Sequence, residues 1–374
     1  MRRLTLLLSL IFALPATSQT VPAPAGPVPQ RHEFVIRNFR TESGVTLPEA
    51  HLVYGTYGTL NADRSNALLL PSHYMANLTG YGFLIQSPTN PSGALDTSKL
   101  FLVTSELFGN GRSSSPSNTP APFDGPRFPV MTIRDNVNAV HQLLTEELHI
   151  QHLRAVIGFS MGAQQAFQWA VSYPSYMDRI VATSGTAKTY GHGIVRLEGQ
   201  IAALTADAAF LDGNYKTEPA KGLAAFGMVW AGWLYSQEWW RKELWRTTAA
   251  PGTTFEQYMF SFRKRFSADA NDYILQARTW ESNDVGATKM ADGKPTSFGG
   301  DVEKALASIQ VPVLYMPSAT DLYFPLEDAK YEAAFLKQGT LMPIPSLWGH
   351  PAGAGASLAD KQFLNENIAT FLGK

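Results

Sequence analysis

Short apolar runs alternate with longer amphipathic stretches along this chain. Each run is only a few residues long, as in strands that are buried on both faces of a parallel sheet. The stretches between the runs have the apolar spacing of helices that pack one face on a core. This alternation predicts an α/β fold, with a mostly parallel sheet and helices on both of its faces. The predicted strands are 66–71, 100–104, 155–157, 178–184, 311–316 and 340–344.

Turn and capping residues predict where two further elements lie: a hairpin before the first of these strands, and one of the helices. Two strand-like segments, 34–40 and 50–57, are joined by a turn at 42–44 and predict a hairpin at the edge of the sheet. Thr132 is followed three residues later by Asp135, which is the spacing of a capping box, so a helix is expected to begin there.

Between residues 188 and 300 the strand–helix alternation stops. Six of the eight tryptophans fall in this stretch, which predicts several helices, among them 221–233 and 236–246. A helical insertion in a sheet that later resumes is expected to form a cap over the carboxyl edge of the strands. Most of its tryptophans should be the core of the cap, and some should line a pocket beneath it. The expected organisation is a core at 32–187, a cap at 188–300 and a second part of the core at 301–374, with helices at 326–336 and 358–371.

The N-terminus has the pattern of a secretory signal peptide over residues 1–18. Arg2 and Arg3 precede an apolar run from Leu4 to Leu14, and small residues follow it. The run is too short for a helix that spans a bilayer. We therefore expect a protein that is exported, periplasmic or secreted, with a flexible proline-rich leader at 19–31.

The composition narrows the classes of function. The chain has 374 residues, 45% of them hydrophobic, so it can bury a sizeable core. Thirty basic residues stand against thirty-one acidic ones, which gives no reason to expect nucleic acid or an anionic membrane as a partner. The absence of cysteine excludes disulfides and thiol chemistry. The sequence contains no metal-ligand cluster and no phosphate-binding loop, so neither a metal nor a cofactor is expected.

A Gly-x-Ser-x-Gly motif at 158–162 lies where a predicted strand turns into a predicted helix. A turn of one residue holds Ser160 in a strained conformation and lifts its side chain above the sheet, while the two glycines let neighbouring backbone pass closely. Ser160 is therefore the candidate nucleophile. The N–H of Met161, in the first turn of the helix, should face an oxyanion that forms at the site.

A serine nucleophile needs a base, and the base needs a third group to orient it. In this architecture the three residues follow the order serine, acid, histidine. His350 follows the strand 340–344 and Asp321 follows the strand 311–316, so both should lie at the edge of the sheet where ligands bind. We predict His350 as the base and Asp321 as the residue that orients it. The alternatives for the acid are Asp301, which precedes the resumed sheet, and Glu327 and Asp328, whose place in the first turn of a helix is typical of acids that interact with its dipole.

The second oxyanion donor should be a backbone N–H in the loop after the strand 66–71. We expect Met75 to supply it, with Tyr74 as the alternative. His73 lies in the same loop, but it precedes the nucleophile by one crossover of the chain. We therefore expect His73 to shape the loop rather than to act as the base.

Short motifs spread over nearly the whole chain after the leader carry a family resemblance. They lie at 96–102, 113–116, 128–135, 160–162 with Trp169, 173–174, 280–285, 305–309, 321–325 and 348–350. Together they are similar to the homoserine O-acetyltransferase-like branch of the α/β-hydrolases. The resemblance implies the α/β-hydrolase fold and an acyl-enzyme intermediate, and it gives Ser160, Asp321 and His350 the roles of the catalytic triad.

Three departures from the transferases of that branch concern the acyl acceptor. The chain has Phe159 and Ala163 around the nucleophile where the transferases usually have glycines, and a His-Tyr-Met sequence at 73–75 where they have His-Ala-Leu. Pro351 follows His350 where they usually have an acid that would hold the amino group of homoserine. The first hypothesis is therefore an exported serine hydrolase that cleaves a carboxylic ester. The alternative is an O-acyltransferase, and a binding module without catalysis conflicts with the intact set of three residues.

Overall fold

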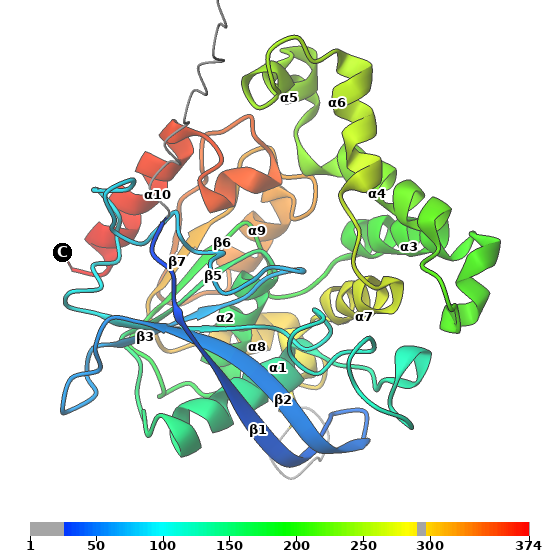
Figure 1. Ribbon diagram of the computed structural model, residues 1–374. Coiled ribbons are helices and arrows are strands. Elements are labelled where there is room, and N and C mark those ends of the chain that lie inside the picture. The colour runs from blue at the N-terminus through cyan, green and yellow to red at the C-terminus, as the bar shows by residue number, and fades with distance from the viewer. Residues whose placement is uncertain (1–25, 290–296, 374) are drawn as a thin grey trace, which may run out of the picture.

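The computed structural model describes residues 26–289 and 297–373 and is organised around one eight-stranded sheet (Figure 1). The strands stand in the order β1-β2-β4-β3-β5-β6-β7-β8; the pairs β1–β2 and β2–β4 are antiparallel and the others are parallel. The predicted α/β fold is confirmed, with the hairpin β1–β2 at one edge. The strands are β1 (Gln30–Arg40), β2 (Thr46–Tyr57), β3 (Ala67–Pro71), β4 (Phe101–Ser105), β5 (Ala155–Phe159), β6 (Ile180–Thr183), β7 (Val313–Met316) and β8 (Gly339–Leu341).

Helices cover both faces of the sheet. Successive side chains of a strand point to opposite faces of the sheet, so each strand contributes to two buried clusters. Leu69 of β3 and Val156 of β5 pack into one of them with α1 and α2. Leu68 and Ile157, one residue away, pack into a second cluster with α10 on the opposite face. The ten α-helices of the described residues are α1 (Ile133–Gln142), α2 (Met161–Ser172), α3 (Gly191–Thr205), α4 (Ala220–Leu234), α5 (Gln237–Arg241), α6 (Phe255–Ser261), α7 (Ala270–Glu281), α8 (Val302–Ser308), α9 (Leu326–Ala333) and α10 (Leu358–Phe371).

Several boundaries differ from the sequence-based prediction. The signal peptide, 1–18, and residues 19–25 of the leader lie outside the described residues, and β1 begins at Gln30, within the predicted leader. The prediction of one continuous helix over 236–246 is wrong. The helix is broken where Glu243 takes a left-handed conformation (φ 50°), which leaves α5 and a short 3-10 turn at Leu244–Thr247. The strand predicted at 340–344 is also shorter, because β8 pairs with β7 only through Leu341.

The helices α3 to α7 leave the sheet after β6 and lie together beside it (Figure 1). Their aromatic side chains pack mainly on one another. Trp239 is fully buried, stacks on Tyr235 with ring centroids 3.7 Å apart, and meets Trp240 edge to face. Trp245 is also buried, against Tyr258. These rings form a core of their own, as expected for a cap.

A buried carboxylate joins this insertion to the sheet. Glu332 of α9 is fully buried and accepts hydrogen bonds from the N–H groups of Ala187 and Lys188, at 2.9 and 3.1 Å, where the chain leaves β6. The hydroxyls of Tyr190 and Tyr315 donate to the same carboxylate at 3.1 and 2.9 Å. Burial raises the pKa of Glu332 to about 7, against the opposing effect of these four donors.

Candidate active site

Ser160 occupies the turn between β5 and α2 in the strained conformation that the motif predicts. Its backbone has φ 58° and ψ −125°, which residues with side chains rarely adopt. The glycines on either side are required by space. A Cβ on Gly158 would lie 2.0 Å from the carbonyl oxygen of Gly162, and a Cβ on Gly162 would lie 2.4 Å from that of Pro71. The turn is therefore packed too tightly for a side chain at either glycine.

Tyr81 supports this turn, and no pattern in the sequence points to its role. Its hydroxyl donates to the carbonyl oxygen of Pro71 at 2.5 Å and accepts from the N–H of Phe159 at 3.0 Å. It thus ties the end of β3 to the end of β5, the strand that carries the serine. An isolated tyrosine in a loop has no sequence signature that would reveal such a contact.

The structure brings the three predicted triad residues together. Nε2 of His350 lies 3.0 Å from Oγ of Ser160, and Nδ1 lies 2.8 Å from Oδ2 of Asp321. All three residues are buried. The other carboxylate oxygen, Oδ1, accepts from the N–H groups of Tyr323 and Phe324 at 2.7 and 3.2 Å. Asp321 is therefore held by its own loop in the orientation that meets the imidazole.

The alternative acids lie elsewhere and have other partners. Asp301 is the N-cap of α8 and accepts from the N–H of Lys304. Glu327 and Asp328 lie in the first turn of α9, where Glu327 pairs with Lys330 at 2.7 Å. Of the four acids considered from the sequence, Asp321 is the one in contact with His350.

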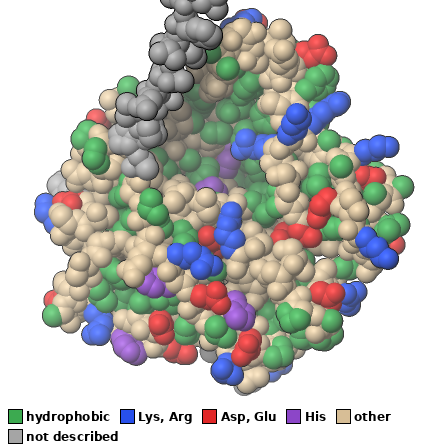
Figure 2. Space-filling view, in the orientation of Figure 1, with side chains coloured by type: hydrophobic (Ala, Val, Ile, Leu, Met, Phe, Trp, Pro, Cys, Tyr) green, Lys and Arg blue, Asp and Glu red, His purple; other side chains and the backbone are tan. Residues whose placement is uncertain are grey.

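Aromatic rings surround the imidazole of His350. The rings of Phe159 and Tyr323 lie with centroids 4.9 and 4.7 Å from it, and Trp280 of α7 lies 6.5 Å away with its plane tilted by 26°. The inserted segment also touches the loop that carries the histidine, since Ser236 donates to the carbonyl oxygen of Leu347 at 2.6 Å. These contacts place the insertion over the site, and Figure 2 shows a hollow in this face of the molecule, lined by hydrophobic side chains.

A buried cation lies behind these rings. The guanidinium of Arg196, on α3, is 4.2 Å from the ring centroid of Tyr323 and 4.4 Å from that of Trp280. One of its nitrogens donates to Gln200 at 3.1 Å, and no carboxylate of the described residues forms an ion pair with it. Burial lowers the pKa of Arg196. The electron-rich faces of these two rings therefore stabilise the cation, together with the negative charge of the nearby Asp321.

His73 lies close to the site but is not bonded to the triad. Its ring meets that of Phe159 edge to face, with centroids 4.9 Å apart, and lies 6.3 Å from that of Tyr81. Burial, and to a smaller extent the neighbouring His350, lower the pKa of His73 to about 3. A neutral ring packed between aromatic side chains agrees with the expected role in shaping the loop.

The backbone donors near Ser160 differ in part from the prediction. The N–H of Met161, at the start of α2, is bonded to no described group. The N–H of Met75 already donates to Oε1 of Gln276 at 2.7 Å, so Met75, the expected second donor, is not free to bind an oxyanion. The N–H of Tyr74, the alternative, has no partner within 26–289 and 297–373. The loop sequence does not reveal this bond, because the partner of Met75 comes from α7, 201 residues later.

Two further features of the described residues bear on function. The described residues contain no cluster of three or more His, Cys, Asp or Glu that could hold a metal ion. Within the same ranges, none of the helices has both the length and the apolar character needed to cross a membrane.

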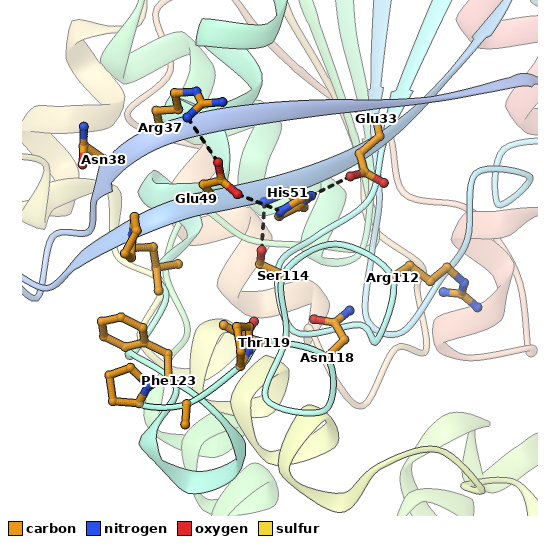
Figure 3. A pocket seen from close by; sticks show the side chains of 15 residues that line it. Glu33, Arg37, Asn38, Glu49, His51, Arg112, Ser114, Asn118, Thr119 and Phe123 are labelled. Atoms are coloured by element: carbon orange, nitrogen blue, oxygen red, sulfur yellow. Dashed lines mark hydrogen bonds and ion pairs between the residues drawn. The ribbon is translucent and has the colours of Figure 1, made fainter.

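A surface groove of about 680 Å³ lies apart from the triad, between the hairpin β1–β2 and the loop 112–123 (Figure 3). Four of its charged or titratable side chains pair with one another, whereas Arg112 pairs with Glu106 outside the lining, at 3.3 Å. Nδ1 of His51 lies 2.6 Å from Glu33, and Arg37 lies 3.3 Å from Glu49. These groups are exposed, where such pairs contribute little. None of Ser160, His350 and Asp321 lines the groove, so it is not the site of the predicted chemistry.

Known proteins with similar sequences and structures share the fold described above. The family model for the alpha/beta hydrolase fold matches residues 94–357. An ethyl acetate hydrolase of Pseudomonas veronii is 34% identical over 338 residues, which cover 88% of this chain and 92% of that protein. The solved structure of an acetylester hydrolase from Corynebacterium glutamicum has a TM-score of 0.84 at 30% identity and covers 92% of this chain and 96% of its own. A homoserine O-acetyltransferase of Chlorobium chlorochromatii is 28% identical, over 90% of this chain and 93% of that protein.

The chain belongs to the α/β-hydrolase family. Within that family it falls in the homoserine O-acetyltransferase-like branch, in which esterases stand beside the transferases. The resemblance drawn from the short motifs is thus confirmed, and the remaining question is which acyl acceptor this chain uses.

Proposed function

We propose that the chain is an exported serine hydrolase that cleaves small carboxylic esters, with acetyl esters as its main substrates. The observation that carries the proposal is the continuous set of hydrogen bonds from Ser160 through His350 to Asp321, at 3.0 and 2.8 Å. Relatives described as an ethyl acetate hydrolase and an acetylester hydrolase support the choice of the acetyl group.

In the proposed reaction Oγ of Ser160 attacks the ester carbonyl while Nε2 of His350 takes its proton. Asp321 accepts the N–H at Nδ1 and so keeps Nε2 free as the base. The negative oxygen of the tetrahedral intermediate is held by the N–H groups of Met161 and Tyr74. The intermediate collapses as His350 returns the proton to the leaving alcohol. A water molecule, deprotonated by His350, then attacks the carbonyl of the acyl-serine. The bond between this carbonyl and Oγ of Ser160 breaks, His350 returns the proton to Oγ, and the carboxylic acid leaves.

Water is favoured as the acyl acceptor by the residue after His350. The transferases that the chain resembles usually have an acid there, which would bind the ammonium group of homoserine. Pro351 has neither a charge nor an N–H to offer. A site without that partner should discriminate strongly against the amino-acid acceptor. The signal peptide proposed for residues 1–18 supports the same conclusion, since acetyl-CoA is a cytoplasmic metabolite and an exported enzyme would be separated from it.

The test is to supply the purified chain from residue 19 onward with ethyl acetate and aryl acetates in buffer, and separately with acetyl-CoA and homoserine. We expect release of acetate from the esters and no release of CoA, with Ser160→Ala abolishing ester turnover. Formation of O-acetylhomoserine faster than any ester is hydrolysed would refute the proposal. Detection of the chain in the periplasm or medium, with its N-terminus near residue 19, tests export.

A further inference from the structure

The loop that carries the proposed oxyanion donor Tyr74 is held from the insertion above it. Two hydrogen bonds join them. The hydroxyl of Tyr74 donates to the carbonyl oxygen of Tyr273 at 2.9 Å, and the N–H of Met75 donates to Oε1 of Gln276 at 2.7 Å. Both acceptors belong to α7. The ring of Tyr74 also stacks on that of Trp230, with centroids 5.3 Å apart and planes 25° from parallel. The position of this loop therefore depends on a helix outside the sheet.

Gln276 uses both halves of its side-chain amide at this point. Its oxygen accepts from Met75, and its nitrogen donates to the carbonyl oxygen of Phe108 at 3.1 Å. Phe108 follows β4 and is fixed in turn, because its N–H donates to Asn136 of α1 at 2.9 Å. Gln276 is fully buried, so no water replaces a lost partner cheaply. The amide thus links the loop to a rigid part of the core.

Met75 needs such a partner because its own conformation is unfavourable. Its φ is +52°, the left-handed region, which costs a residue with a side chain on the order of 1 kcal/mol. A strained residue persists only where its surroundings hold it. Within the described residues the N–H of Met75 makes a single hydrogen bond, and that bond is to Gln276. Two hydrogen bonds therefore hold the turn: the one from Met75 to Gln276, and one within the loop from the N–H of Ala76 to the carbonyl oxygen of His73 at 3.0 Å. Gln276 is the side chain that fixes the peptide between Tyr74 and Met75 from outside the loop.

We propose that Gln276 is a positioning residue for the oxyanion hole. By binding the N–H of Met75 it holds the left-handed turn, and the turn leaves the N–H of the preceding residue, Tyr74, free to bind the substrate oxygen. This inference rests on the proposed ester hydrolysis. It predicts that Gln276 affects the transition state, in which negative charge develops on the oxygen, far more than it affects substrate binding.

The test compares Gln276→Leu, which keeps the approximate size of the side chain and removes both bonds, with the intact chain on an aryl acetate. We expect kcat to fall by about 10- to 100-fold, which does not exceed the fall caused by removing an oxyanion donor outright. KM should change by less than about threefold. The matched control is Gln168→Leu, which removes another fully buried amide that binds Ser172 and Thr288, away from the loop. Gln168→Leu should leave kcat within about twofold of that of the intact chain, even where its melting temperature falls as far as that of Gln276→Leu.

Glycine at position 75 provides a second and more specific measurement. Glycine adopts positive φ without strain, so Met75→Gly should restore part of the kcat that Gln276→Leu loses. The same substitution also keeps the experiment informative if Gln276→Leu alone folds poorly. The inference is overturned if Gln276→Leu retains or raises kcat, if only KM changes, if Gln168→Leu loses as much kcat, or if Met75→Gly restores nothing. Ser160→Ala separates the two proposals, since an active Ser160→Ala variant refutes ester hydrolysis by this triad, whereas an inactive one beside an unaffected Gln276→Leu refutes only this inference.

Discussion

Replacement of Asp321 by asparagine exchanges one oxygen of the site for an NH₂ group and tests the proposed role of the whole triad. The new amide can keep its oxygen in the place of Oδ1, where it still accepts from Tyr323 and Phe324. The amide nitrogen then stands in the place of Oδ2, 2.8 Å from Nδ1 of His350. That nitrogen can only donate, so Nδ1 must accept and the proton of the imidazole moves to Nε2. Nε2 faces Ser160 at 3.0 Å and can no longer remove its proton.

The magnitude follows from this inverted tautomer. An asparagine in the corresponding position of a serine protease lowers kcat by about 10⁴-fold with the geometry intact. A similar loss is expected here, which corresponds to about 5.5 kcal/mol in the activation free energy. The fold should survive, because the hydrogen bonds from Tyr323 and Phe324 change from charged to neutral rather than disappear. That change costs about 1 kcal/mol for each bond, or a few degrees in the melting temperature.

The assay is the steady-state rate with an aryl acetate together with a thermal melt of each variant. Asp301→Asn is the matched control, since it removes a carboxylate that the sequence left as an alternative, and asparagine is an equally good N-cap for α8. Its kcat should equal that of the intact chain. A loss below about 100-fold in Asp321→Asn, with the fold intact, would show that His350 does not depend on Asp321 for its tautomer.

Three other predictions follow from contacts described above. Because burial raises the pKa of Glu332 from 4.5 to about 7, the folded chain holds this proton more tightly than the unfolded chain, and the free energy of unfolding should fall by about 3 kcal/mol as pH rises through that range. Urea titrations at several pH values should show this loss for the intact chain and not for Glu332→Gln. Parallel curves of unfolding free energy against pH for the two proteins would contradict the prediction. Gly158→Ala, whose Cβ would meet the backbone of Gly162, should lower the melting temperature sharply and abolish turnover, whereas Gly199→Ala, with no atom within 4 Å of its Cβ, should be neutral or stabilising. Trp280→Ala should change the relative rates with acetyl, butyryl and longer esters, and Trp239→Ala should mainly lower the melting temperature; the reverse pattern would place the acyl pocket elsewhere.

The parts of the fold and site that local patterns determine could be predicted from the sequence. The strand, turn and helix around Ser160 are specified within a single stretch, and the order of the later strands then suggested Asp321 and His350. The choice among four acids was harder, because all four stand near the ends of helices or strands. The structure distinguishes them through the loop of Tyr323 and Phe324, which holds one carboxylate towards the imidazole.

The parts that could not be predicted depend on contacts between distant segments. The sequence favours Met75 over Tyr74 as a donor, because nothing in the loop reveals that Gln276 binds the N–H of Met75. The role of Tyr81 likewise depends on contacts with distant segments, at Pro71 and Phe159. The break of the predicted helix at Glu243 has a different origin, since helix-forming residues on both sides favoured one continuous element and the tertiary packing of Trp239 and Trp245 prevailed.

Because most of the tryptophans lie in the inserted helices, intrinsic tryptophan fluorescence should report mainly on that part of the molecule. Trp239, Trp245 and Trp280 are almost wholly shielded from water, so their emission should be blue in the folded chain and shift to the red when the inserted helices loosen. The sheet region contributes a smaller share of that signal, because six of the eight tryptophans lie in the insertion. Of the other two, Trp169 is buried in α2 and Trp348 stands beside Trp239. Far-ultraviolet circular dichroism, in contrast, reports the helices and strands of the whole chain. Melting curves recorded by the two signals coincide if insertion and sheet unfold as one unit and separate if they do not.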